Sequence, residues 1–161
     1  MADYRILSGQ WVLPMVPRGA ALADHATVIR DGRILEVLPT ALAVDRHPGA
    51  EHQSFPRHAL LPGFVNAHTH AAMTLLRGIG GDLPLMDWLQ HHVWPAEARL
   101  LSPEFVRDGS MLAVAEMLRG GTTCFNDMYL FPEETADIVH ASGIRAVLGL
   151  TVIDFPTPWA Q

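Results

Sequence analysis

Residues 59–154 alternate between strand-like and helix-like segments, and no other feature of the sequence restricts the fold as strongly. Runs rich in Val, Leu, Thr or Ile predict strands at residues 59–70, 122–127 and 145–154, the first of them buried. Strands joined by helical crossovers lie parallel in one sheet, because each crossover returns the chain to the same end of the sheet. The pattern therefore predicts an α/β fold.

Helix signals separate the three predicted strands. Ser102 can cap a helix whose first position is Pro103, and Gly120 begins a Gly-Gly pair that stops it. A second helix is predicted over residues 133–142, because acids occupy its first turn and Gly143 follows its end. These signals support the alternation of strands and helices.

A shorter helix is predicted between the first strand and these two helices. Apolar residues recur over residues 85–94, and Pro95 is expected to end or kink the helix, since the residue before a proline disfavours helical angles. His91 and His92 face different directions on such a helix. We therefore expect them to be partly exposed and not to share a metal ion.

Residues 1–57 have a different pattern and predict a β-rich unit. Short apolar runs predict strands at residues 4–7, 10–13, 27–29 and 33–38. Asp31-Gly32 lies between two of these runs and predicts a type I′ hairpin, because both residues tolerate positive φ angles. The histidines of this region lack metal-ligand spacing and are expected at the surface or in loops: His25, His47, His52 and His58.

The first strand of the α/β region ends in the sequence His68-Thr69-His70. Side chains at i and i+2 of a strand point to the same face, about 6.6 Å apart, so the two imidazoles can converge on one zinc-type ion. A lone His-x-His often arises by chance, but its position after an apolar strand favours a metal site. Polar residues also end the other two strands: Asn126, Asp127 and Asp154. Ligands of parallel α/β folds gather at such strand ends.

Three predicted parallel strands are too few for a complete barrel. An eight-stranded barrel typically needs about 250 residues, whereas about 100 residues follow the first strand here and supply three strands. We therefore expect the front part of a larger enzyme. A three-stranded open domain is the alternative, although its outer strand edges would be uncovered.

Composition excludes several classes of partner. The 11 Lys+Arg against 17 Asp+Glu give a net charge of −6 without any cluster of cations, which argues against nucleic acid. No apolar run has the length of a membrane span, and the first residues lack a signal-peptide pattern. The single Cys124 forms no internal disulfide. A cytoplasmic protein is expected.

Five motifs follow one another along the chain: Leu61-Pro62-Gly63-Phe64-Val65-Asn66-Ala67-His68-Thr69-His70, Leu76-Arg77-Gly78, Leu83-Pro84-Leu85-Met86-Asp87-Trp88-Leu89, Pro95-Ala96-Glu97 and Gly120-Gly121-Thr122-Thr123. In this order they resemble the metal-dependent amidohydrolase superfamily. Within the superfamily, the sequence is most similar to the 5′-methylthioadenosine/S-adenosylhomocysteine deaminase group, beside the triazine chlorohydrolases. The resemblance covers essentially the whole chain.

The resemblance implies a fold and a set of site residues. Residues 1–57 would be the N-terminal part of a β-sandwich, and residues 58–161 would supply the first three strands of a (β/α)₈ barrel, an incomplete fold. His68 and His70 match the first two ligands of one zinc, or another divalent metal, per subunit. Trp88 matches a residue lining the nucleoside pocket, and Glu97 matches the acid that binds the ribose hydroxyls. Without the resemblance, Trp88 would be interpreted as core packing and Glu97 as a solvated acid.

The implied activity is hydrolytic deamination of 5′-methylthioadenosine or S-adenosylhomocysteine to the inosine analogue and ammonia. The family's other metal ligands and its acid–base residues lie on later strands, so no catalytic residue is expected within this chain. Gly149 and Leu150 stand where some members carry a substrate-contacting Arg. A homodimer and the remaining C-terminal part of the enzyme are the expected partners. The alternatives are a deaminase or chlorohydrolase of guanine or a triazine, and an inactive fragment.

Overall fold

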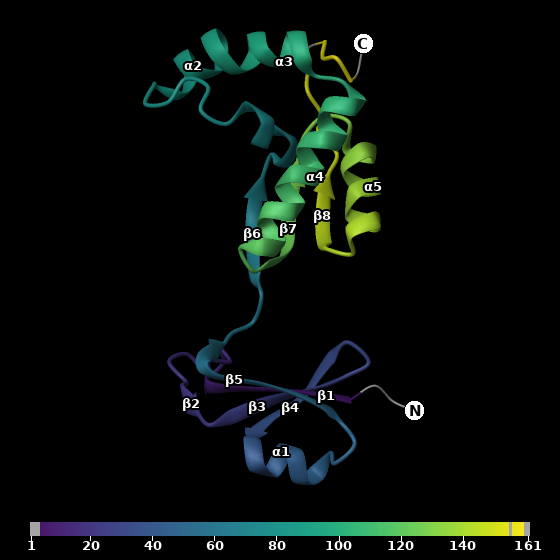
Figure 1. The fold of residues 1–161 in the computed structure, drawn as a ribbon. Helices are drawn as coiled ribbons and strands as arrows, with labels where there is room; N and C mark the ends of the chain where they lie inside the picture. The colour runs from purple at the N-terminus through teal and green to yellow at the C-terminus, as the bar shows by residue number, and fades with distance from the viewer. Residues whose placement is uncertain (1–3, 155, 160–161) are drawn as a thin grey trace. The chain divides into compact units, whose positions relative to one another are not determined.

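The computed structural model describes residues 4–154 and 156–159 (Figure 1). The chain forms two compact units that divide between Pro62 and Gly63. Within the described residues, no helix combines the length and the apolar character needed to cross a membrane.

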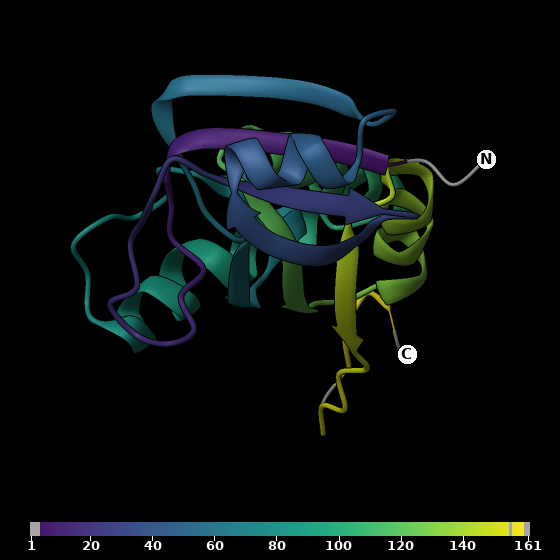
Figure 2. The same cartoon turned by 90° about the horizontal axis from the view of Figure 1, so that it is seen from below.

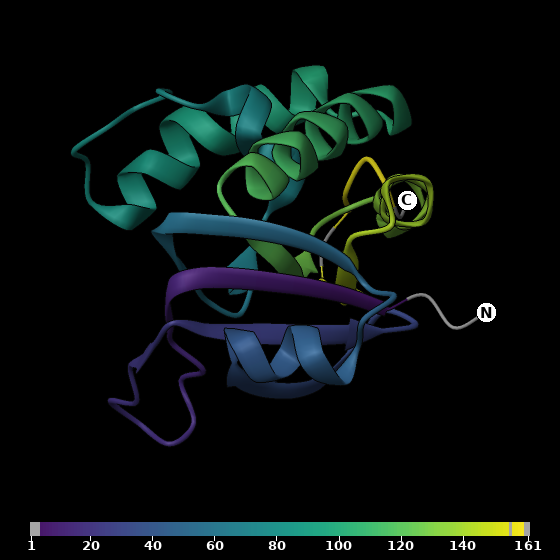
Figure 3. The same cartoon turned by 60° about the horizontal axis from the view of Figure 1, so that its bottom comes forward.

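The N-terminal unit is a curled sheet with one helix. Four antiparallel strands lie in the order β2-β1-β3-β4, and β5 pairs in parallel with β1. Their bounds are β1 Tyr4–Val12, β2 Leu22–Ala23, β3 His25–Arg30, β4 Arg33–Pro39 and β5 Glu51–Leu60. Helix α1 (Thr40–Arg46) packs against β3 and β4, as Figure 3 shows. The core under this helix contains Ile6, Ala26, Val28, Leu38 and Ala43.

The predicted hairpin is confirmed, because Asp31 and Gly32 join β3 to β4 with φ angles of 50° and 74°. The predicted strands at residues 4–7 and 10–13 are one strand, β1, with a register irregularity between Gly9 and Trp11.

Strand β5 and helix α1 were not predicted from the sequence. Most side chains of β5 are exposed, so this strand lacks the alternation of apolar and polar residues that marks a half-buried strand. It is held by backbone pairing with β1, from Arg5↔Glu51 to Val12↔Leu60. His52 and His58 lie in β5 and not in loops, but both are exposed, which confirms the predicted surface positions.

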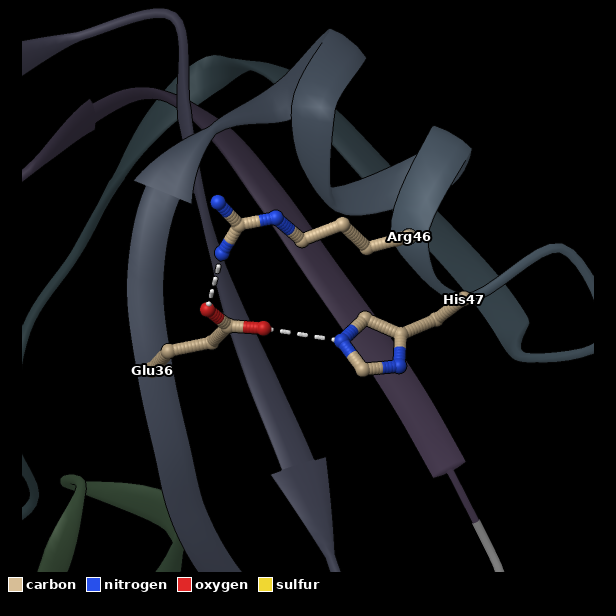
Figure 4. A network of polar contacts seen from close by, with 3 residues as sticks. All are labelled: Glu36, Arg46 and His47. Atoms are coloured by element: carbon tan, nitrogen blue, oxygen red, sulfur yellow. Dashed lines mark hydrogen bonds and ion pairs between the residues drawn. The ribbon is translucent and has the colours of Figure 1, made fainter.

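His47 directly follows α1, outside any helix or strand as predicted, and is only partly exposed because it joins a network at the end of that helix (Figure 4). Its Nε2 lies 2.8 Å from Oε1 of Glu36, and Nη1 of Arg46 donates to Oε2 of the same carboxylate at 2.9 Å. The ring of Tyr4 stacks on the His47 ring at 5.0 Å between centroids. The network ties α1 to strand β4.

The C-terminal unit contains a parallel sheet in the order β6-β7-β8, which confirms the predicted alternation (Figure 2). Its strands are β6 Phe64–Thr69, β7 Thr122–Met128 and β8 Arg145–Gly149, linked through α4 (Pro103–Arg119) and α5 (Pro132–Ser142). A core of Ala71, Ala113, Val114, Phe125 and Ile144 includes residues of the sheet and of α4.

The predicted ends of these helices are confirmed. The Ser102 hydroxyl accepts a hydrogen bond from the Phe105 N–H at 3.1 Å, and Pro103 is the first residue of α4. Gly143 ends α5 with a φ of 73°, a conformation in which a residue without Cβ is favoured.

Two predictions about the strands are wrong. Strand β6 is not buried, because residues 64–68 are exposed on an edge strand that pairs only with β7 among the described residues. Strand β8 ends at Gly149 and not at residue 154, since its pairing stops at Met128↔Gly149. Asp154 therefore lies beyond the strand end.

A run of helical segments follows β6. It begins with the 3₁₀ helix η1 (Ala71–Leu76) and continues with α2 (Leu85–Trp88), the π-helical η2 (Leu89–Val93) and α3 (Trp94–Leu100) (Figure 1). Pro95 was expected to end or kink the helix predicted over residues 85–94. It does not end the helix, because helical structure continues through α3 to Leu100. The Trp94 N–H donates to the Leu89 carbonyl five residues back, and the wider π turn accommodates the proline that follows, which has no N–H.

Candidate active site

His68 and His70 lie close together at the C-terminal end of β6. Their ring centroids are 4.9 Å apart, with the planes nearly perpendicular at 83°. Nδ1 of His70 lies 2.6 Å from the carbonyl oxygen of Met128. Because a carbonyl only accepts, Nδ1 carries the proton and Nε2 keeps its lone pair. Nε2 of His70 is therefore able to coordinate a metal ion.

These two imidazoles fit part of a zinc site. Neutral histidine nitrogen is a ligand that zinc prefers, and a second-shell carbonyl commonly orients such a ring. Across residues 4–154 and 156–159, no group of three or more His, Cys, Asp or Glu side chains is arranged to hold a metal ion.

Asp127 forms hydrogen bonds with the residues on both sides of His70. Its carboxylate, in a residue only 3% exposed, accepts from the Thr69 hydroxyl at 2.6 Å and from the Ala71 N–H at 2.7 Å, both at Oδ1. From the sequence, Asp127 was predicted only as a polar residue at the end of a strand, without its hydrogen-bond partners. Its pairing with Thr69 and Ala71 depends on the register of β7 beside β6.

A pocket of about 330 Å³ lies at this end of the sheet and includes His70, Trp88 and Glu97 in its lining. His68 does not line the pocket, but its ring adjoins that of His70. Much of the remaining wall is apolar, with Leu85, Leu89, Val93, Trp94 and Ile153 among its residues. The volume is within the range of small-molecule sites.

Trp88 is half-buried at the end of α2, with its indole anchored to the loop before it. The indole N–H donates to the Ile79 carbonyl at 2.8 Å, so the polar atom is already engaged. Gly80, with φ 63°, lies against the same ring, and a Cβ there would stand 2.9 Å from Cδ1 of Trp88 and 2.8 Å from Cγ of His92. What Trp88 offers the pocket is therefore apolar ring surface.

Glu97 projects from α3 and accepts a hydrogen bond from Tyr129, whose hydroxyl lies 2.6 Å from Oε1. Burial raises the pKa of Tyr129 above its ordinary value, and the Glu97 carboxylate raises it further. The hydroxyl therefore stays protonated and remains a donor. Among the described residues, Tyr129 is the only hydrogen-bond partner of the Glu97 side chain.

Other sequence-predicted positions lie away from the pocket. His91 is exposed and His92 partly buried on η2, close to the partial exposure predicted, and neither lines the pocket. Asp154 does not line it, whereas Thr151 and Ile153 do. Tyr129 was missed, although its place directly after the strand that carries Asn126 and Asp127 could have indicated it.

Residues 59–157 match the model of the Amidohydrolase family. The chain is 48% identical over 156 residues to a 5-methylthioadenosine/S-adenosylhomocysteine deaminase from Saccharophagus degradans, covering 97% of this chain and 35% of that protein. A 5′-deoxyadenosine deaminase from Methanosarcina barkeri is 48% identical over 149 residues, covering 92% of this chain and 33% of the relative.

A zinc-bound adenosine deaminase from Xanthomonas campestris has the same fold over this stretch. It superposes with a TM-score of 0.93 at 51% identity, covering 98% of this chain and 36% of that one. The chain thus spans about a third of the length of the proteins it matches.

Proposed function

The chain belongs to the amidohydrolase family, and on this premise we propose that the protein containing it hydrolytically deaminates adenosine derivatives. The proposed substrates are 5′-methylthioadenosine and S-adenosylhomocysteine, and the products are the inosine analogue and ammonia. The deaminase names of the relatives from Saccharophagus degradans and Methanosarcina barkeri support this reaction.

One observation carries the proposal: a single pocket is lined by His70, Trp88 and Glu97. A carboxylate has acceptor sites for two hydroxyl donors at once, as the neighbouring hydroxyls of a ribose require. The apolar wall and the Trp88 ring suit a flat purine. The histidine pair would then face the reacting end of the base.

His68 and His70 would hold a divalent metal, for which zinc is our proposal. A bound zinc supplies a water molecule whose pKa is lowered toward neutrality. The role of these two residues is to supply imidazole nitrogens, and the Met128 carbonyl keeps the His70 lone pair on Nε2. Glu97 would hold the sugar end, so that binding energy remote from the reaction positions the ring.

We propose that β6, β7 and β8 are the first three strands of a (β/α)₈ barrel that begins at Gly63, where the second unit starts. The N-terminal unit, which extends past the expected boundary at residue 57 to the end of β5 and Pro62, would be the N-terminal part of a β-sandwich domain. The parallel order of the three strands and the superposition on the Xanthomonas campestris enzyme support this assignment. Further metal ligands and the acid–base residues of the reaction would come from later strands.

The test is ammonia release by the complete gene product, supplied with zinc, from 5′-methylthioadenosine, S-adenosylhomocysteine, adenosine and guanine. We expect release from the adenosine derivatives and a loss of about 100-fold in kcat/KM for Glu97→Ala, since a charged acceptor of two hydrogen bonds is removed. Glu104→Ala, which removes an exposed carboxylate on α4, is the matched control. Activity on guanine alone, or activity indifferent to Glu97, would reject the nucleoside assignment.

A further inference from the structure

Tyr129 lies between the two functional parts of the pocket. It directly follows β7, is 8% exposed and packs in a cluster with Ala72 and Val106. Its hydroxyl donates to Oε1 of Glu97 at 2.6 Å, and its ring centroid is 6.2 Å from that of His70. The residue therefore adjoins both the histidine pair and the acid.

We propose that Tyr129 is a positioning residue that fixes the Glu97 carboxylate for the 2′- and 3′-hydroxyls of a ribonucleoside. It would thereby favour ribonucleosides over nucleosides that lack these hydroxyls. The inference rests on the proposed function, because it assigns Tyr129 a role in binding the same substrate.

The acceptor positions of the Glu97 carboxylate support this role. An ionised carboxylate has about four acceptor positions, and one phenolic O–H occupies one of them. Two further hydroxyl donors can still bind, one of them at Oε2. Because Tyr129 donates the hydrogen bond to Glu97, the carboxylate stays an acceptor and can still bind hydroxyl donors of a sugar.

Burial of the tyrosine ring gives the hydrogen bond its positioning effect. A glutamate side chain has several rotatable bonds, and fixing it on substrate binding costs conformational entropy. The Tyr129 ring is held in a buried cluster, so its hydroxyl is a fixed point for a carboxylate that would otherwise move. Part of the entropic cost of ordering the Glu97 side chain is then incurred before the substrate binds.

The experiment compares adenosine with 2′,3′-dideoxyadenosine in the complete zinc-loaded gene product and in its Tyr129→Phe variant. We expect the KM for adenosine to rise about 10-fold with kcat little changed, as for loss of one charge-assisted hydrogen bond. The KM for 2′,3′-dideoxyadenosine should not change, because that nucleoside has no hydroxyl for Glu97 to accept. A merely structural role would affect both nucleosides equally.

Two further variants sharpen the test. In a Glu97→Gln background, Tyr129→Phe should cause no further rise in the KM for adenosine, since Tyr129 is proposed to act through the Glu97 carboxylate. Tyr4→Phe removes the same hydroxyl from a tyrosine of the N-terminal unit and should leave both KM values unchanged. Zinc content and thermal midpoint are measured for every variant.

The outcomes separate the inference from the proposed function. If the unaltered protein releases ammonia from no adenosine derivative, the proposed function fails and the inference with it. If it is active but Tyr129→Phe changes neither KM, or raises both equally, the inference alone is overturned. A rise confined to adenosine, absent in the Glu97→Gln background, supports it.

Discussion

Gly80 and Gly78 form a natural pair for testing how Trp88 is placed. Both have positive φ angles, 63° and 85°, so an alanine at either position pays a similar backbone cost, about 1 kcal/mol. Only at Gly80 would the added Cβ meet the Trp88 and His92 rings, whereas nothing lies within 4 Å of the corresponding atom at Gly78. The difference between the two variants isolates the contact with the rings.

We predict that Gly80→Ala raises the KM for the proposed nucleoside substrate several-fold, because the methyl group displaces the Trp88 ring from the pocket wall. Gly78→Ala should lower the thermal midpoint slightly and leave the KM unchanged. Steady-state kinetics and thermal unfolding of the complete gene product check both. Equal KM values in the two variants would contradict the assigned placement of Trp88.

Asp127 supports a second prediction at the scale of single residues. Asp127→Ala leaves the buried Ala71 N–H without its acceptor, which costs about 1–3 kcal/mol of stability. Because Thr69 and Ala71 flank His70, we expect zinc affinity to fall about 10-fold, as when outer-shell partners of metal ligands are removed. Competition with a zinc chelator measures this change. Asp137→Ala, at an exposed position on α5, should leave it unaltered.

At the scale of elements, α4 packs unusually close to η1. Gly109 of α4 is buried, and a Cβ there would lie 2.4 Å from the carbonyl oxygen of Ala72. Gly→Ala within an exposed helix normally stabilises a protein by about 1 kcal/mol. Here we predict the opposite sign, a loss of about 1–3 kcal/mol in the free energy of unfolding, because the backbone contact must open. Denaturant unfolding of Gly109→Ala decides the sign.

The junction of β4 and α1 depends on pH through Glu36. The His47 hydrogen bond holds the pKa of Glu36 below its usual value of 4.5, and Arg46 lowers it further. The ionised form is thus favoured in the folded state, so this stabilisation is fully present above about pH 4.5 and is lost as the pH falls through the lowered pKa.

We therefore predict that amide hydrogen exchange in α1 accelerates as the pH is lowered below about 4.5, after correction for intrinsic exchange rates. Glu36→Gln should remove most of this acid dependence and make exchange faster at neutral pH. Glu51→Gln, at an exposed carboxylate of β5, serves as the control. An unchanged acid dependence in Glu36→Gln would show that another group is responsible.

The same elements show what local sequence can predict. Helix α4 was predictable because Ser102, Pro103 and the following glycines are signals that act within a few residues of each other. Strand β5 was not, because its polar side chains carry no pattern and its pairing with β1 joins residues more than 40 positions apart in the chain. At the site, His68 and His70 were recognisable from their spacing. The contact of Tyr129 with Glu97 joins two elements and depends on tertiary structure.

At the scale of the molecule, the three-stranded parallel sheet exposes apolar side chains on strands β6 and β8. Phe64 is 58% exposed, Val65 67% and Val147 62%. Exposed apolar strands with unpaired edges are templates for association with further chain. In a closed barrel, further strands would pair with the open edges of β6 and β8, and side chains from the other strands would pack against the faces of the sheet, which agrees with the proposed architecture.

We predict that residues 1–161 expressed alone self-associate, or bind the remaining strands of the proposed barrel when these are supplied. Size-exclusion chromatography with light scattering measures the association, and a variant with both Val65→Lys and Val147→Lys should associate less, because charge at an open strand discourages pairing. The complete gene product should elute without such aggregates if the proposed barrel is correct, since its further strands would pair with these edges. A stable, compact monomer of 17.7 kDa from the unaltered 161 residues would contradict this prediction and favour the open three-stranded domain.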